Sequence, residues 1–119
     1  MQFDRFSIVM LYRNPEAPEL SDEEGGALQD AHLDHLATLH EAGHLVAAGP
    51  TALGDPDEEL RGLSILKVDV DRARELAETD PGVRAGVFTL KIMPWMVPAG
   101  AIAHTPARFP HSSAEATRD

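Results

Sequence analysis

Apolar and polar residues alternate over residues 3–13, FDRFSIVMLYR. In an extended chain, residues two positions apart share one side, so the alternation separates two sets of side chains. One set is Phe6, Ile8, Met10 and Tyr12, and the other is Ser7, Val9 and Leu11. Both sets are mostly apolar, so the pattern predicts a strand that is covered on both faces.

A helical spacing begins after the proline-containing loop RNPEAPEL. Ser21 and Glu24 have the spacing of a capping box, in which each side chain accepts a hydrogen bond from the backbone N–H of the other residue. The stripe that follows repeats every 3.6 residues and consists of Leu28, His32, His35, Leu36 and Leu39. Gly43 is placed to end the helix in a left-handed turn. We therefore expect a helix that begins at about Ser21 and ends before Gly43.

The rest of the chain predicts three more strands and a second helix. The strands are residues 44–51, 61–69 and 85–97, and the helix runs to about Glu78 after a cap at Asp69 or Asp71. Asp80-Pro81-Gly82 is predicted to be the turn that ends this helix. The order β-α-β-β-α-β predicts an α+β fold of the ferredoxin-like plait type, in which two helices cover one face of an antiparallel sheet.

The sheet face without helices is predicted to pair with a second copy of the chain. In the last strand, this face carries Val87, Met93 and Trp95. Leaving apolar side chains in water is unfavourable by about 25 cal/mol per Å² of their surface. We therefore expect a homodimer that is joined sheet to sheet.

A single domain and a C-terminal segment make up the 119 residues. Residues 1–97 contain every predicted element, and residues 98–119 are rich in proline, alanine and serine without a periodic pattern. Such a segment is either a flexible tail, or it lies along the body of the molecule or a neighbouring subunit with Phe109 as its anchor.

Composition limits the classes of function. The net charge is −10, and residues 14–60 contain twelve Asp or Glu and no Lys or Arg. This distribution repels phosphate, so we do not expect nucleic acid as a partner. No apolar run approaches the roughly 20 residues that cross a bilayer, and the first ten residues lack the pattern of a secretory signal. We therefore expect a cytoplasmic protein without a membrane partner. The absence of cysteine excludes disulfides and thiolate nucleophiles.

Four histidines lie within residues 32–44. His32 and His35 share the apolar stripe that should face the sheet. A histidine there is either a core residue whose ring binds a carbonyl or water, or a general acid/base, because an unperturbed pKa of about 6.5 allows proton transfer near neutral pH. His40 and His44 have the spacing of two metal ligands, but Gly43 interrupts the helix between them and no third ligand follows at a suitable spacing. We expect no metal site.

Three segments, in their order along the chain, resemble the YciI-related (YCII) family. The first is His32-Leu33 followed by Leu36, Leu39, Gly43 and Ala48-Gly49-Pro50, the second is Gly62 at the start of the third strand, and the third is Asp80-Pro81 followed by Val83, Ala85-Gly86-Val87-Phe88 and Pro94-Trp95. The resemblance spans residues 3–97. It implies a ferredoxin-like fold that pairs into a dimeric α/β barrel, and enzymatic activity with His32 as the base and Asp80 as the acid that orients it. The chain departs from the family pattern at Gln29, where arginine is frequent, and at Gly82, where an aromatic residue is frequent.

Asp80 has two alternative roles. It follows the second helix, which runs roughly parallel to the first in this fold, whereas His32 lies about 16 Å along the helix axis before Gly43. The two side chains can therefore meet only if the helices are staggered or if the contact crosses the dimer. Otherwise the Asp80 carboxylate binds backbone N–H groups of the Asp-Pro-Gly turn.

These observations predict a small acid/base enzyme of the lyase, dehydrohalogenase or isomerase type that acts on a small cyclic organic substrate. His32 and Asp80 are the candidate catalytic residues, and the candidate substrate-binding residues are His35, Gly49, Pro50 and Trp95. Neither GxGxxG nor a P-loop GK[ST] occurs, and the proton transfer needs no organic cofactor, so we expect none. The alternative is a non-catalytic dimeric module that binds a small molecule or a protein.

Overall fold

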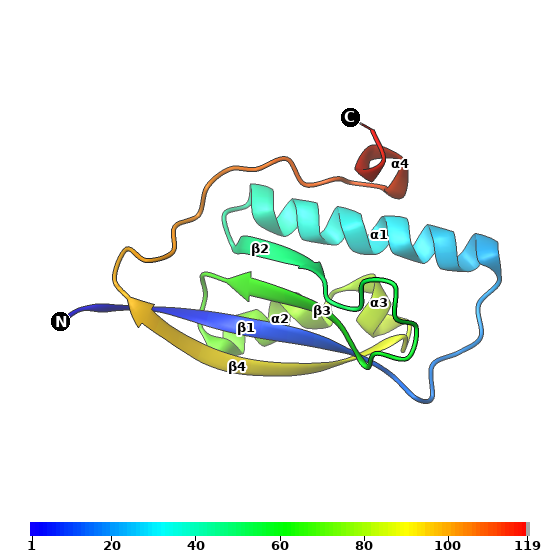
Figure 1. Cartoon of the computed structure of the whole chain (residues 1–119), viewed down its shortest axis with the longest axis horizontal. Helices are drawn as coiled ribbons and strands as arrows, with labels where there is room; N and C mark the ends of the chain where they lie inside the picture. Colours follow the sequence, from blue (N-terminus) through cyan, green and yellow to red (C-terminus); the bar gives the residue numbers. More distant parts are fainter. Residues whose placement is uncertain (119) are drawn as a thin grey trace.

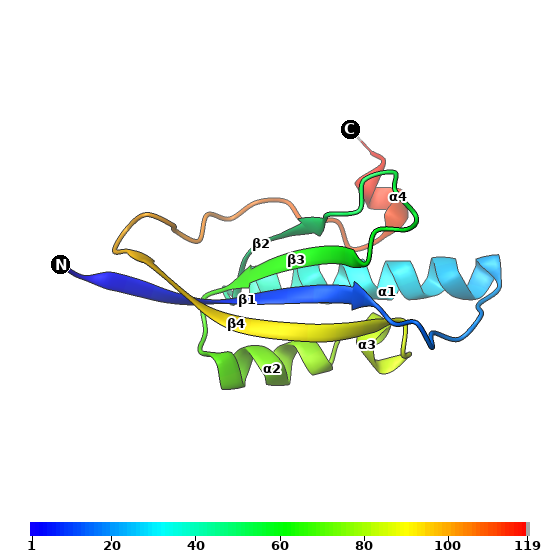
Figure 2. The same ribbon diagram turned by 60° about the horizontal axis from the view of Figure 1, so that its bottom comes forward.

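The computed structural model describes residues 1–118. Within them, an antiparallel sheet contains β1 (Phe3–Arg13), β2 (Leu45–Pro50), β3 (Leu60–Leu66) and β4 (Phe88–Pro98) in the order β2-β3-β1-β4 (Figure 1). The two longer helices, α1 (Asp22–Glu41) and α2 (Val70–Glu78), pack on the same face of this sheet (Figure 2). The predicted α+β, ferredoxin-like fold is therefore confirmed.

The pairing of β1 with its two neighbours determines which side chains share a sheet face. Ile8 lies opposite Ile65 of β3 and Met93 of β4, while Leu11 lies opposite Gly62 and Leu90. Side chains that are directly opposite across a ladder point to the same face. The face that carries Leu11 meets the helices, and the face that carries Ile8 is free of them.

Local sequence signals mark both ends of α1. The Ser21 hydroxyl accepts a hydrogen bond from the Glu24 N–H at 3.1 Å, and the Glu24 carboxylate accepts one from the Ser21 N–H at 3.2 Å. After the C-terminal end of the helix, Gly43 has a φ of 86°, which favours glycine over residues with a side chain. The capping box and the stop that were predicted are both present.

A short helix, α3 (Pro81–Arg84), replaces the turn that we expected after α2. Pro81 occupies its first turn, where the missing N–H of proline costs no hydrogen bond. The Asp80 carbonyl accepts the Arg84 N–H at 2.9 Å, which closes the first helical turn. A turn and a single-turn helix have the same residue preferences, so the local sequence does not distinguish between them.

The hydrophobic core lies between the sheet and the two longer helices. Its buried members come from three strands and from α2 and are Val9, Leu11, Leu45, Leu66, Ala73 and Ala77. Leu36 and Leu39 of α1 pack against this cluster. The stripe that predicted the buried side of α1 therefore does face the sheet.

Several large apolar residues remain exposed on β1 and β4. Their exposed fractions are 45% for Phe3, 36% for Met93, 37% for Trp95 and 55% for Met96. Met93 and Trp95 lie on the face without helices, where Trp95 is opposite Phe6. An exposed apolar surface of this kind is typical of an interaction site, which is consistent with a sheet-to-sheet homodimer. The homodimer itself stays a prediction. Within residues 1–118, no helix has both the length and the apolar character needed to traverse a bilayer.

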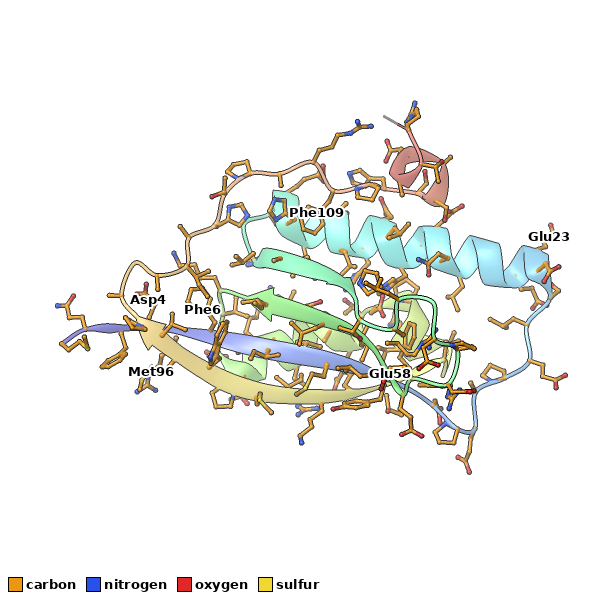
Figure 3. All side chains as sticks on the ribbon, viewed as in Figure 1. Asp4, Phe6, Glu23, Glu58, Met96 and Phe109 are labelled. Carbon is orange, nitrogen blue, oxygen red and sulfur yellow. The ribbon has the colours of Figure 1, made fainter. Side chains whose placement is uncertain are left out.

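The C-terminal segment runs back along α1 and ends in a short helix, α4 (Ser113–Ala116) (Figure 1). The Phe109 ring stacks on the ring of His40 with centroids 4.1 Å apart, at the C-terminal half of α1 (Figure 3). His40 Nε2 accepts the Ala107 N–H at 2.9 Å, so Nδ1 carries the proton that is donated to the Leu45 carbonyl at 2.6 Å. Of the two alternatives for this segment, the structure shows the one in which it lies along the body of its own chain.

A second anchor of this segment is electrostatic. His111 contacts Glu41 Oε1 at 2.9 Å through Nε2 and Asp34 Oδ1 at 2.6 Å through Nδ1. These hydrogen bonds raise the pKa of His111 to about 9, with the bond to Glu41 as the larger cause. His111 is therefore positively charged at neutral pH and offsets two acidic residues of α1.

Candidate active site

His32 and Asp80 meet at the centre of the candidate site. His32 lies on α1, and Asp80 lies between α2 and α3. His32 Nδ1 is 2.7 Å from Asp80 Oδ1, and only 14% and 5% of the two side chains are exposed. The contact forms within one chain because α3 packs against α1, so that the end of the short α2 lies beside the interior of the longer helix. The helices are thus staggered in the way that this contact requires.

The contact determines which nitrogen of His32 is available for chemistry. An ionised carboxylate only accepts hydrogen bonds, so Nδ1 of His32 carries the proton that is donated to Asp80. Nε2 of the neutral ring then has a lone pair that can accept a proton. The centroid of the Phe88 ring lies 5.8 Å from that of the His32 ring.

Asp80 is almost completely buried and only partly satisfied. Its exposed fraction is 3%, and within the described residues its Oδ2 atom has no hydrogen-bond partner. A cavity of about 20 Å³ adjoins this residue and is also lined by His35 and Ser64. A cavity of this size accommodates one water molecule. Burial lowers the pKa of His35, an effect that the negative charge of Asp80 opposes.

A much larger cavity, of about 920 Å³, lies on the other side of His32. His32, Leu36, Leu11 and Ser64 line both cavities, so they form the wall between them. Glycine and proline at the end of β2, Gly49 and Pro50, line the large cavity. The C-terminal segment supplies a further wall, which consists of Phe109, Pro110, Ser113, Ala116 and Thr117.

Gly82 allows Phe88 to lie close to the His32–Asp80 pair. A Cβ atom at position 82 would be 2.7 Å from the Phe88 ring and 3.3 Å from Asp80 Oδ2. A side chain at position 82 would therefore collide with the Phe88 ring in this chain.

We predict that Gly82→Ala lowers the free energy of unfolding by about 1–3 kcal/mol, because the new methyl group overpacks the Phe88 ring. Gly26→Ala is the matched control, since a Cβ at position 26 meets no atom within 4 Å. That substitution in α1 should raise the free energy of unfolding by up to about 1 kcal/mol. Urea denaturation measures both effects, and a destabilisation of the same size in both variants would contradict the role of Gly82.

The structure brings together most of the residues that the sequence singled out. His32 and Asp80 are in direct contact, His35 lines the small cavity, and Gly49 and Pro50 line the large one. Trp95 lies on the opposite face of the sheet, and within one chain it lines neither cavity. The reason is register: Trp95 shares its face with Met93, which points away from the helices. Its expected role in substrate binding stays a prediction.

His40 and His44 are the two histidines that have the spacing of metal ligands. Both ring nitrogens of His40 are engaged by backbone groups, which leaves no lone pair for a metal ion. No group of three or more His, Cys, Asp or Glu side chains with ligand geometry occurs within residues 1–118. The structure instead gives His40 the role of docking the C-terminal segment.

Two arginines of the large cavity, Arg13 and Arg61, were not among the predicted site residues. These two arginines flank residues 14–60, a stretch that contains twelve Asp or Glu and no Lys or Arg. Their position at the two ends of this acidic stretch was the signal in the sequence that could have drawn attention to them. Phe88 and the C-terminal segment were also missed as parts of the site, because only the fold brings them to α1.

The chain is similar to known proteins in sequence and in structure. One similar structure is that of 5-chloro-2-hydroxyhydroquinone dehydrochlorinase (TftG) from Burkholderia phenoliruptrix AC1100, which was solved in complex with 2,5-dihydroxybenzoquinone. The two sequences are 23% identical, the match covers 76% of this chain and 92% of that chain, and the TM-score is 0.49. No curated protein matches the chain. The model of the YCII-related domain matches residues 6–96, which is most of the chain. The chain therefore belongs to the YCII-related domain family.

Proposed function

We propose that this chain is a small acid/base enzyme in which His32 transfers a proton of a small cyclic organic substrate and Asp80 orients His32. The observation that carries the proposal is the 2.7 Å contact between two largely buried side chains, of which His32 lines a cavity of about 920 Å³. A cavity of this size is typical of sites for small organic molecules. A carboxylate bound to one imidazole nitrogen is a common arrangement for a general base.

The two nitrogen atoms of the His32 imidazole have different roles in the proposed chemistry. Nε2 of His32 accepts a proton from a carbon or hydroxyl group of the substrate, and the Nδ1–H bond to Asp80 stabilises the imidazolium that forms. In an elimination, the electron pair of the broken bond forms a new double bond and expels a leaving group such as halide. In an isomerisation, the imidazolium returns the proton to another atom of the substrate.

A turnover assay with small cyclic compounds tests this proposal. The first compounds to test are halogenated hydroxyhydroquinones, because the similar dehydrochlorinase is named after a compound of this class. The assay measures halide release together with the absorbance of the quinone product. We expect turnover that depends on His32. Saturable binding of these compounds without turnover of any of them would instead support a non-catalytic module that binds small molecules.

We also propose that the chain forms a homodimer through the sheet face that lacks helices. Trp95→Glu places a charge on this face and is expected to shift the protein from dimer to monomer, because an unpaired charge in an apolar interface is strongly unfavourable. Leu53→Glu is the control, since Leu53 is 81% exposed in the loop between β2 and β3. Analytical ultracentrifugation distinguishes the outcomes. A monomeric wild-type protein, or a Trp95→Glu variant that remains a dimer, would contradict the proposed interface.

A further inference from the structure

The large cavity differs in charge from the rest of the molecule. The chain contains 20 Asp or Glu against 10 Lys or Arg, yet no acidic residue is among those that line this cavity. Its charged lining residues, within the part of the chain that the structure describes, are Arg13 and Arg61. The cavity is therefore positive in a protein whose net charge is −10.

Both guanidinium groups are held by main-chain carbonyls of the loop between β2 and β3. Arg13 Nη1 donates to the Pro56 carbonyl at 3.1 Å, and Arg61 Nη1 donates to the carbonyls of Asp55 and Glu58 at 3.3 and 3.0 Å. Carbonyls fix the direction of a guanidinium group without neutralising its charge. Within residues 1–118, neither arginine forms an ion pair with a carboxylate.

Two of the four acidic side chains of this loop, those of Asp55 and Glu58, bind its own backbone. Asp55 Oδ1 accepts the Asp57 N–H at 2.9 Å, and Glu58 Oε1 accepts the Leu60 N–H at 3.3 Å. Neither side chain lines the large cavity, although Glu58 lies in the same loop as the carbonyls that bind Arg61 (Figure 3). The lining of the large cavity thus includes both arginines and no carboxylate side chain.

The remainder of the cavity suits a ring. Its apolar lining includes Leu33, Leu36, Leu63, Phe88 and Phe109, and His32 contributes the proton-accepting group. A guanidinium group presents five N–H donors, of which only those on Nη1 are used here for the loop carbonyls. The others remain to bind anionic oxygen atoms, for which a guanidinium group is well suited.

We propose that this cavity binds a small cyclic organic anion, with Arg13 and Arg61 as the subsite for its negatively charged oxygen atoms. The inference rests on the proposed function, since it names the substrate class of the same site. The anionic oxygen belongs either to an ionised ring hydroxyl or to a carboxylate, and both would be bound by the same N–H donors. The ring then lies between the arginines and His32, among the apolar lining residues.

Two matched pairs of probes test the proposal. The first pair is 2,5-dihydroxybenzoquinone, which ionises at its ring hydroxyls, and its neutral relative 2,5-dimethoxybenzoquinone. The second pair is benzoate and the neutral benzamide. Isothermal titration calorimetry of the full chain measures the affinity for each. We expect at least one anion to bind about tenfold or more tightly than its neutral relative, with an affinity that falls as salt concentration rises.

Substitution of the arginines separates recognition from loop structure. Arg13→Gln and Arg61→Gln should each weaken binding of the preferred anion by about tenfold and leave binding of the neutral relative unchanged. Arg72→Gln is the control, because Arg72 is exposed on α2, where it pairs with Glu75. An equal loss for anion and neutral compound would mean that the arginines only hold the loop, and it would overturn the proposal.

Two further outcomes would also overturn it. One is equal affinity of the wild-type protein for both members of each pair, and the other is no binding of either anion at millimolar concentration. The role of His32 is tested independently, because His32→Asn should still bind the anion in an arginine-dependent way while it loses turnover. Anion binding without any His32-dependent turnover would leave the subsite in place and remove the proposed enzymatic function.

Discussion

His32→Asn is expected to lower turnover of a substrate by roughly 10²- to 10⁴-fold, the range that general acid/base catalysis contributes. Asparagine keeps a polar group near Asp80 Oδ1, with which His32 is in contact, but it has no atom that accepts and returns a proton near neutral pH. Steady-state kinetics on the substrate with the highest turnover in the panel measures the effect on kcat and KM. We expect the loss in kcat, because the imidazole acts on the bound substrate.

The control for this substitution is His44→Asn. His44 lies outside both cavities, near the start of β2, so its replacement should leave turnover unchanged. Circular dichroism and thermal unfolding check that both variants are folded. If His32→Asn retained wild-type kcat, or if His44→Asn lost as much activity, His32 would not be the base.

Asp80→Asn is expected to give a similar loss of turnover, on the order of 10²- to 10⁴-fold, for a different reason. The amide is neutral, so it neither fixes the proton on His32 Nδ1 nor stabilises the imidazolium. The free energy of unfolding should change by less than about 2 kcal/mol, because the substitution removes a buried charge whose Oδ2 atom has no partner within the described residues. The expected result is thus a large loss in kcat without a comparable loss of stability.

Asp71→Asn provides the matched control for Asp80. Asp71 is an exposed residue in the first turn of α2 and lines neither cavity. The loss of its carboxylate should therefore leave kcat unchanged. A loss of turnover in Asp80→Asn that matches its loss of folded protein would show that Asp80 is needed only for structure.

Local signals were sufficient to predict α1 and the sheet. Ser21, Glu24 and Gly43 determine the ends of α1 through contacts within a few residues, and such contacts are visible in the sequence. The alternation in β1 and β4 likewise determines which side chains face the helices. Helix α3 was not predicted, because the sequence Asp80-Pro81-Gly82 is as compatible with a turn as with the first residues of a helix.

The His32–Asp80 contact was not determined by local pattern. The two residues are 48 positions apart, and their contact depends on how far α2 and α3 extend beside α1. The resemblance to the family named the pair, but only the fold shows that they meet within one chain. The large cavity was not visible in the local pattern either. One of its walls is the C-terminal segment, which has no periodic pattern and docks through His40 and His111.

Trp95 was predicted both as a pocket residue and as part of the dimer face. The resemblance to the family includes this residue, and it belongs to the apolar side chains that predicted the dimer. The strand pairing of β4 puts it opposite Phe6 on the face without helices. Its position there supports the proposed dimer interface, and its role in substrate binding stays a prediction.

The protonation state of the His32 ring tests the proposed base most directly. Long-range ¹H–¹⁵N NMR spectra of the free protein, with His32 assigned by comparison with His32→Asn, show which ring nitrogen of the neutral imidazole carries the proton. The contact with Asp80 predicts that Nδ1 carries it, that Nε2 is unprotonated, and that the preference is lost in Asp80→Asn. A neutral ring with its proton on Nε2 in the wild-type protein would show that Asp80 does not hold His32 as a base, and would contradict the proposed mechanism.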